Sequence, residues 1–469
     1  LVAINVETDR LQTADYNQIP VHSKGHGFFT EGMGWWNTDS RRIYFIDMER
    51  GYRTVRLVEF NAETGDTRVL FEEISKTHIN LKQHYDERPT FMPLPKSNEI
   101  LWFSERSGWA HVYLYDLETG LLKHPVTQGE WIVRHILYFD TTRREVFVQT
   151  AGRKANSNLQ IEVERDPYYC DLARINIDTG EITTLAASNH DYFVASKKNI
   201  NTIFKTNIMG CDTGLANSVS PSGNFAVVTR SRADEVAISL LLDRDGKELL
   251  TLETADISAL PEGWHWPEPV KLLAADGKTD IYGLVFRPSH FSPDQAYPVI
   301  SHGFNTPESP WVSKGSFGNG AFSNWPYLDA AALSELGFIV VQIDGRGTPF
   351  RHKAFHDESY GNFPSASNLK DHVAGIRQLA KRYPYMDLKR VGITCHTAGG
   401  LSGVQGLLQH SDFYKVGVNG GCLHDPRLTS ASMQMEKWEG MAVPTYQPLE
   451  NQVEHLQGKL LLTHGLINS

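Results

Sequence analysis

The sequence has little of what would tie it to a membrane, to nucleic acid or to a disulfide framework. No apolar run among its 469 residues approaches the roughly 18 residues of a membrane span. Its net charge is −10 with both signs interspersed, which argues against a surface for nucleic acid or anionic membranes. The four cysteines are widely separated and show no zinc or CxxC spacing, so they neither require nor exclude an oxidising compartment.

The ends of the sequence also lack familiar signals. The opening LVAINVETDR contains no methionine, no basic stretch and no signal-peptide core, and it reads like the interior of a strand. The closing GKLLLTHGLINS stops just after a predicted strand. We therefore expect both ends to be cuts through a longer protein, and its length indicates two or three domains.

Residues 1–265 show a repeated strand–turn–strand rhythm. Four hairpins each carry a glycine at the end of the turn, where a positive φ is needed: Gly65, Gly120, Gly180 and Gly246. Another apolar strand precedes each hairpin, so about four strands recur every ~55–65 residues, which is typical of propeller blades. The pattern predicts a partial β-propeller domain over 1–265, with about four blades and part of a fifth at the N-terminus. The alternative is an irregular all-β domain with similar hairpins by chance.

The rhythm changes in residues 266–469. A hairpin turning at Asp276-Gly277 is followed by alternating apolar strands and helical patterns. The strands are predicted at 298–301, 338–344, 390–394, 416–419 and 459–463, and the helices at 327–337, 368–383 and 401–410. Short apolar strands between helices predict a mostly parallel sheet covered on both faces. We expect an α/β-hydrolase domain over 266–469 with an incomplete C-terminus, and ligands bind at the carboxyl ends of such strands.

The stretch RVGITCHTAGGLSG, residues 390–403, has the outline of a nucleophile elbow. In such an elbow a sharp strand-to-helix turn exposes its central residue close to backbone N–H donors. The central position here is Thr397, where a serine is expected, and Cys395 stands where the leading glycine would be. By itself this is a weak signal, because strand–turn–helix units with paired glycines are common in parallel sheets.

The order of motifs around the elbow strengthens the signal. The segments YPVISHGFNTPESP, GFIVVQIDGRGTPF, LKDHVAGIRQLAKR, KRVGITCHTAGG and LLLTHG follow one another as in the catalytic domain of the prolyl oligopeptidase family of serine peptidases. The dipeptidyl peptidase IV-like branch is the most similar, since residues 87–120 resemble a late blade of that branch's propeller. The resemblance covers nearly the whole chain in order.

The resemblance assigns roles to residues that are altered here. The nucleophilic serine falls on Thr397, the triad aspartate on Asn468, and the oxyanion tyrosine on Phe304. The backbone N–H of Ala398 would be the second oxyanion donor, and the triad histidine would lie beyond Ser469, so it is absent from this chain. The stretch 422–435, where aromatic residues would pack a substrate proline, contains none. The family's paired glutamates, which hold a substrate's amino terminus, would precede Leu1.

Three interpretations of Thr397 stay open: a structural residue on an inherited turn, a true threonine nucleophile with a base from elsewhere, or a misread serine. Threonine adds a β-branch to a strained turn. Asparagine can orient an imidazole but cannot neutralise an imidazolium. A phenylalanine at 304 removes one oxyanion donor, a loss worth about 3 kcal/mol in a serine protease.

Other candidate residues have ordinary structural explanations. Cys395 beside His396 would be a buried structural cysteine, because adjacent side chains in a turn point apart. His352 and His356 have the i, i+4 spacing of zinc ligands, but no third ligand is predictable and a solvated helical face is the simpler interpretation. The Ser301–Gly303 segment is similar to the His-Gly loop that supplies backbone donors in esterases. Trp264 and Trp266 are expected to pack the two domains together.

The sequence therefore predicts a serine-type peptidase by resemblance, acting on peptides without a cofactor or metal ion. The alternatives are a catalytically inactive homologue that binds a peptide or a partner, and an esterase-like acyl hydrolase that uses the Ser301–Phe304 loop. The loss of an aromatic S1 wall argues against strict release of dipeptides after proline. Export to an extracytoplasmic (periplasmic or secreted) location and a homodimer are implied by the resemblance only, while substrate-binding residues are not assigned.

Overall fold

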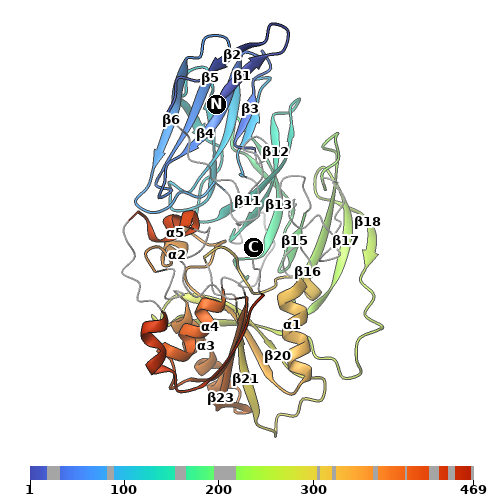
Figure 1. Ribbon diagram of the computed structural model, residues 1–469. Helices are drawn as coiled ribbons and strands as arrows, with labels where there is room; N and C mark the ends of the chain where they lie inside the picture. Colours follow the sequence, from blue (N-terminus) through green and yellow to red (C-terminus); the bar gives the residue numbers. More distant parts are fainter. Residues whose placement is uncertain are drawn as a thin grey trace.

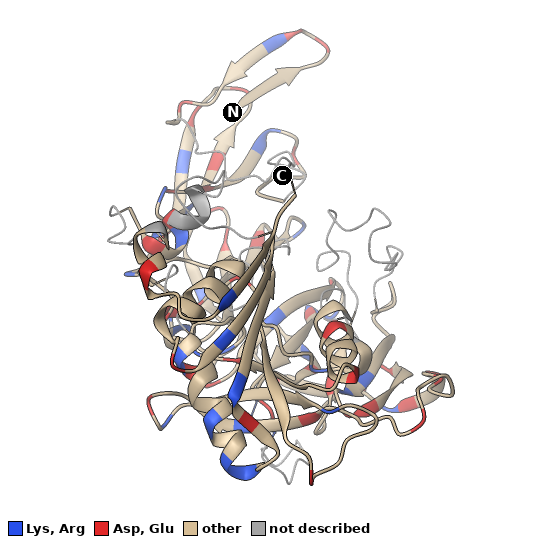
Figure 2. Ribbon diagram, turned by 60° about the horizontal axis from the view of Figure 1, so that its bottom comes forward, with Lys and Arg blue, Asp and Glu red and all other residues tan. Residues whose placement is uncertain are grey.

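The chain folds into antiparallel sheets in its first half and one large, mostly parallel sheet in its second half (Figure 1). The computed structural model describes residues 1–17, 32–81, 89–153, 165–194, 218–303, 307–318, 324–362, 368–396, 399–421, 432–441 and 449–465. Positively and negatively charged residues are intermixed over both halves (Figure 2). None of the helices in the described ranges is both long and apolar enough to cross a membrane.

The described part of the first half contains four four-stranded antiparallel sheets and one hairpin. The hairpin pairs β1 (Val2–Asn5) with β2 (Arg10–Thr13). The first sheet consists of β3 (Gly34–Trp36), β4 (Arg42–Met48), β5 (Thr54–Asn61) and β6 (Thr67–Ile74). The second consists of β7 (Met92–Leu94), β8 (Glu99–Ser104), β9 (His111–Asp116) and β10 (Leu122–Pro125). The third sheet consists of β11 (Ile132–Asp140), β12 (Glu145–Ala151), β13 (Cys170–Asn176) and β14 (Ile182–Ala186). The fourth consists of β15 (Asp191–Phe193), β16 (Phe225–Arg232), β17 (Glu235–Asp243) and β18 (Glu248–Thr254).

Glycine turns shape these sheets as predicted. Gly65, Gly120, Gly180 and Gly246 join the last two strands of successive sheets, and all four have positive φ. Neighbouring sheets pack face to face: Trp102 of the second sheet lies in one core with Tyr44 of the first, and Leu101 on its other face joins Val148 of the third. The strand-by-strand order and the packing confirm the predicted blades.

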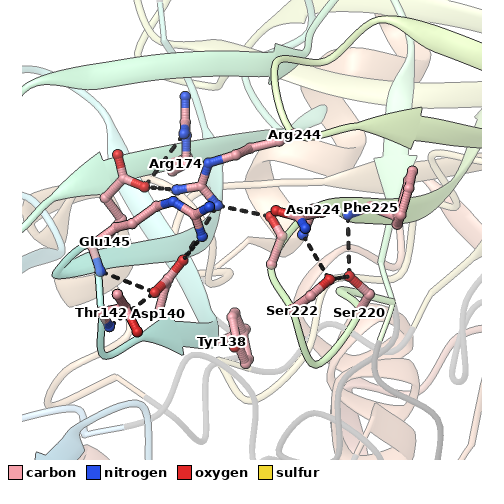
Figure 3. A network of polar contacts seen from close by, with 12 residues as sticks. Tyr138, Asp140, Thr142, Glu145, Arg174, Ser220, Ser222, Asn224, Phe225 and Arg244 are labelled. Atoms are coloured by element: carbon pink, nitrogen blue, oxygen red, sulfur yellow. Dashed lines mark hydrogen bonds and ion pairs between the residues drawn. The ribbon is translucent and has the colours of Figure 1, made fainter.

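A partly buried polar network joins the third and fourth sheets (Figure 3). Arg244, just after β17, forms ion pairs with Asp140 and Glu145 at the β11–β12 turn and donates a hydrogen bond to the carbonyl of Gly223 at 2.8 Å. Tyr138 donates to the carbonyl of Pro221 at 2.6 Å. The network fixes adjacent blades through charge-assisted bonds at the point where their turns meet.

The second half is built on a seven-stranded sheet with the order β19-β20-β22-β21-β23-β24-β25. Its strands are β19 (Glu268–Leu273), β20 (Asp280–Phe286), β21 (Tyr297–His302), β22 (Ile339–Asp344), β23 (Met386–His396), β24 (Tyr414–Gly420) and β25 (Lys459–Thr463). β19 and β20 form the predicted hairpin, β20 is antiparallel to β22, and the other neighbours pair in parallel. The prediction of a mostly parallel sheet is confirmed.

Helices cover both faces of this sheet (Figure 1). α1 (Asn324–Glu335), α3 (Leu369–Arg382) and α4 (Gly400–Gln409) pack on the sheet. The described part of this half also contains the short helices α2 (Lys353–Asp357) and α5 (Ser432–Glu439) and 3-10 turns at Ser316–Gly318 and Leu449–His455. Tyr327 of α1 packs with Phe286 and Val340 on one face. Ile376 of α3 and Leu407 of α4 join the core on the opposite face. The short helices α2 and α5 were not predicted.

Trp264 and Trp266 lie in the segment between the two halves. Both rings contact Phe317, at 6.1 and 5.3 Å between centroids. Trp264 also packs on the apolar cluster that joins Ala233, in the β16–β17 turn, to Phe286 of the large sheet. This contact confirms that Trp264 helps to pack the two halves together. The same role for Trp266, whose ring contacts Trp264 and Phe317, and a domain boundary at residue 265 stay predictions.

Candidate active site at the carboxyl edge of the seven-stranded sheet

The carboxyl ends of β21, β23, β24 and β25 meet at one edge of the large sheet. His302 at the end of β21 pairs with Thr394 of β23, and His396 at the end of β23 pairs with Gly420 of β24. Gly420 in turn pairs with Thr463 of β25. The chain segments that continue from these strands carry the predicted site residues, so the sheet brings their starting points together.

The predicted site residues themselves are Phe304, Thr397, Ala398 and Asn468, and all four lie outside the described residues. Their roles therefore stay predictions. What the structure describes is the frame on both sides of them: His396 ends β23 and Gly399 precedes α4.

Helix α4 packs very closely on strand β24. Gly403 of α4 lies so near β24 that a Cβ on it would be 1.9 Å from the Oδ1 of Asn419. Only glycine permits this approach, which sets the angle at which α4 leaves the strand. Cys395 is buried and not in a disulfide, as expected for a structural cysteine. The N-terminus of α4, whose dipole favours negative charge, begins two residues after Ala398.

His302 is the centre of a buried hydrogen-bond network beside this turn. Its imidazole is completely buried, and its Nδ1 lies 3.0 Å from the indole Nε1 of Trp311 and 2.9 Å from the amide Nε2 of Gln342. Because an indole N–H can only donate, Nδ1 accepts and the proton is on Nε2. That Nε2–H donates to Oδ2 of Asp329 at 2.7 Å. The bond holds the pKa of Asp329 below its ordinary value.

Sequence reasoning did not find the His302–Asp329 pair. It noted the Ser301–Gly303 segment as a source of backbone donors, but the N–H of Gly303 donates to the carbonyl of Thr394 at 3.2 Å and is not free for an oxyanion. The only local feature that marks Asp329 in the sequence is its i, i+4 spacing from Trp325, which places both side chains on one face of α1. Their pairing with His302 depends on how α1 docks.

The loop after β22, which contains the DGRG motif, is anchored by two buried carboxylates. Asp344 accepts hydrogen bonds from the backbone N–H groups of Trp311 and Val312, at 2.7 and 3.2 Å, and burial raises its pKa to about 6. Asp371 of α3 accepts two bonds from the guanidinium of Arg346, at 2.9 and 3.1 Å. Glycine at position 345 allows the loop to lie this close to α3, since a Cβ on it would be 2.5 Å from the Cβ of Asn368.

His352 and His356 have structural roles in the described residues. His352 is the N-cap of α2, and its Nδ1 accepts from the N–H of Phe355 at 3.2 Å. His356 is buried, contacts the carbonyl of Pro307 through Nε2 at 2.7 Å, and has a pKa lowered to about 3 by burial. The described residues contain no group of three or more metal-ligating side chains around this pair.

The blades contact the large-sheet half through α2 and α5. Lys353 donates to the carbonyl of His78 at 2.8 Å, and its backbone N–H donates to the carbonyl of Gly108 at 2.8 Å. The ring of His78 is buried against Trp438 of α5, at 4.3 Å between centroids. The candidate site therefore lies in a half whose helices are packed directly on the propeller turns.

The antiparallel blades of the first half, followed by a mostly parallel sheet in which helix α4 comes directly after strand β23, define a partial β-propeller joined to an α/β-hydrolase domain. Residues 12–207 match the sequence model of the dipeptidyl peptidase IV N-terminal region, and residues 325–467 match that of the prolyl oligopeptidase family. The chain belongs to the prolyl oligopeptidase family, in its dipeptidyl peptidase IV-like branch.

Individual relatives agree with this assignment. The chain is 25% identical to human dipeptidyl peptidase 8 over 396 residues, which cover 78% of this chain and 40% of the relative. It is 22% identical to dipeptidyl peptidase 4 of Trichophyton tonsurans, with 77% and 43% covered. The crystal structure of Porphyromonas gingivalis dipeptidyl peptidase 4 has the same fold, with a TM-score of 0.73 at 19% identity, covering 98% of this chain and 58% of that one. The chain thus spans about two fifths of the length of the curated relatives that it matches.

Proposed function

We propose that the protein is a serine-type peptidase that hydrolyses peptides at the carboxyl edge of its seven-stranded sheet. The observation that carries the proposal is the place of residue 397 in the chain, directly after strand β23 and just before α4, within the segment that matches the prolyl oligopeptidase family. The relatives' names, dipeptidyl peptidases 8 and 4, support peptides as the substrate class.

In this proposal the side chain at 397 attacks the carbonyl carbon of the scissile peptide bond. The carbonyl oxygen becomes an oxyanion that the backbone N–H of Ala398 stabilises, and the positive end of the α4 dipole adds to that stabilisation. An imidazole base accepts the hydroxyl proton and returns it to the leaving amine, and Asn468 orients that imidazole. Water then hydrolyses the acyl-enzyme. Phe304 supplies no hydroxyl to the oxyanion, so we expect slower turnover than with tyrosine.

A second candidate function is peptide binding without cleavage. The observation in its favour is that the three positions equivalent to the family's nucleophile, acid and oxyanion tyrosine carry Thr397, Asn468 and Phe304. Independent changes at all three are what a chain released from selection for catalysis would accumulate.

Mass spectrometry of peptide digests separates the two functions. The purified protein is incubated with a peptide library, and cleavage is compared between the wild type, Thr397→Ala and Thr183→Ala, the last being a control on the distant strand β14. The peptidase proposal predicts that only Thr397→Ala loses cleavage, by at least about a hundredfold. If peptides bind equally to all three proteins and are recovered uncleaved, the binding function is favoured instead.

The proposal includes the homodimer that the family resemblance implies. Sedimentation velocity on the purified protein at micromolar concentration tests it, and a single species with the mass of one chain would contradict it.

A further inference from the structure

Asp329 is an ionised carboxylate without a cationic partner among the described residues. Its only ion-pair contact in that part of the chain is with His302, whose Nε2–H donates to Oδ2 at 2.7 Å. In this arrangement Nδ1 of His302 accepts the indole N–H of Trp311, so the imidazole carries its proton on Nε2 alone. The negative charge of Asp329 is therefore held and oriented by a neutral histidine but not neutralised.

The carboxylate is accessible to a ligand. The side chain of Asp329 is 32% exposed, whereas the imidazole behind it is completely buried. The second oxygen, Oδ1, has no hydrogen-bond partner within the described ranges. A charge fixed on its inner side and open on its outer side has the geometry of a binding group, because its orientation is set before a ligand arrives.

Aromatic rings line the same place. Trp325 precedes Asp329 by one turn of α1, and its ring lies 5.1 Å from that of His396 and 5.9 Å from that of Trp311. Trp325 and His396 are both half-buried. Burial lowers the pKa of His396, so it is uncharged at neutral pH and does not repel a cation. A carboxylate one helical turn from a tryptophan is a favourable site for an organic cation, because the carboxylate supplies the opposite charge and an indole ring attracts cations.

We propose that Asp329, Trp325 and His396 form a subsite that binds an ammonium or guanidinium group of a peptide lying along the carboxyl edge of the sheet. The inference deepens the proposed function and rests on it, because His396 directly precedes residue 397. The group bound would be a lysine or arginine side chain, or an α-amine, close to the scissile bond.

A pair of small probes of similar shape tests the subsite without requiring catalysis. Binding of benzylammonium and of benzyl alcohol is measured by calorimetry at pH 7 and low ionic strength. We expect benzylammonium to bind about tenfold more tightly, as one charge-assisted contact provides. Asp329→Asn, which keeps an acceptor for His302, should abolish this preference. The control Asp294→Asn changes an exposed carboxylate in the loop before β21 and should retain it.

Equal binding of the two probes to the wild type would overturn the proposal, and so would a preference that survives in Asp329→Asn. A measurement on the wild type alone guards against a variant that does not fold: the preference must shrink when salt is raised from low to high concentration, and a salt-independent preference would also overturn it. Peptide binding and peptide cleavage, measured on the same preparation, then separate the two claims. Benzylammonium binding that depends on Asp329, in a protein that neither binds nor cleaves any peptide, would support the subsite and refute the proposed function.

Discussion

Replacing Asp371 by alanine should destabilise the large-sheet half strongly. The side chain is completely buried. Its two oxygens accept hydrogen bonds from the backbone N–H groups of Ala275 and Arg346, both at 2.9 Å, in addition to the two bonds from the Arg346 guanidinium. Alanine removes all of these bonds and leaves the partly buried guanidinium of Arg346 with only its longer contacts to Asp276, at 3.3 Å, and Glu358, at 3.8 Å. Breaking a buried ion pair from one side costs about 3–5 kcal/mol.

Thermal unfolding followed by tryptophan fluorescence measures this loss. For a unit of roughly 200 residues, 1 kcal/mol shifts the midpoint by about 2–4 °C, so Asp371→Ala should lower it by roughly 6–20 °C. Asp371→Asn keeps one acceptor oxygen and should fall between the wild type and alanine. The control Asp387→Asn in β23 removes only an ion pair with the exposed Arg390, at 2.7 Å, and should shift the midpoint by at most about 4 °C. A midpoint for Asp371→Ala equal to that of the control would refute the reasoning that this carboxylate anchors the DGRG loop.

Two further substitutions test burial and close packing. Burial raises the pKa of Glu105 to about 7 from the ordinary 4.5; the folded state therefore prefers the neutral acid, and stability falls by about 3 kcal/mol as the pH rises from 4.5 to 7. The melting temperature of Glu105→Gln should therefore exceed that of the wild type at pH 8 and equal it at pH 4.5. Gly403→Ala should cost about 1–3 kcal/mol in denaturant unfolding because its Cβ would collide with Asn419, whereas Gly392→Ala, whose nearest contact would be an ordinary 3.5 Å, should cost less.

The outcomes that contradict these two expectations are specific. A melting difference between Glu105→Gln and the wild type that is the same at both pH values would show that the glutamate does not titrate between them. Equal unfolding midpoints for Gly403→Ala and Gly392→Ala would show that α4 can move away from β24 at little cost.

Local patterns carried most of the fold. The turns at Gly65, Gly120, Gly180 and Gly246 and the apolar strands around them depend on neighbouring residues, so the sequence alone indicates them. The helix predicted at 327–337 begins at Asn324 and ends at Glu335, an error of the size expected when caps decide the boundary. The short helices α2 and α5 were missed, because five and eight residues are too few to show a helical period.

The candidate site was only partly predictable, because its contacts join residues far apart in sequence. The strand ends that bear positions 304, 397 and 468 could be inferred, since parallel strands share one carboxyl edge. The bond from His302 to Asp329 spans 27 residues and depends on how α1 packs on the sheet, which no local pattern encodes. The roles of Thr397 and Asn468 stay predictions that chemistry must test.

The most direct test of the central claim is covalent labelling of the purified protein with a fluorophosphonate, followed by peptide mapping across residues 390–403. The account predicts one phosphonate adduct per chain on this peptide, at residue 397. The same peptide map also shows whether residue 397 is threonine or serine. An unlabelled 390–403 peptide that contains Thr397, in a protein that still binds peptides, would contradict a peptidase and leave peptide binding as its function.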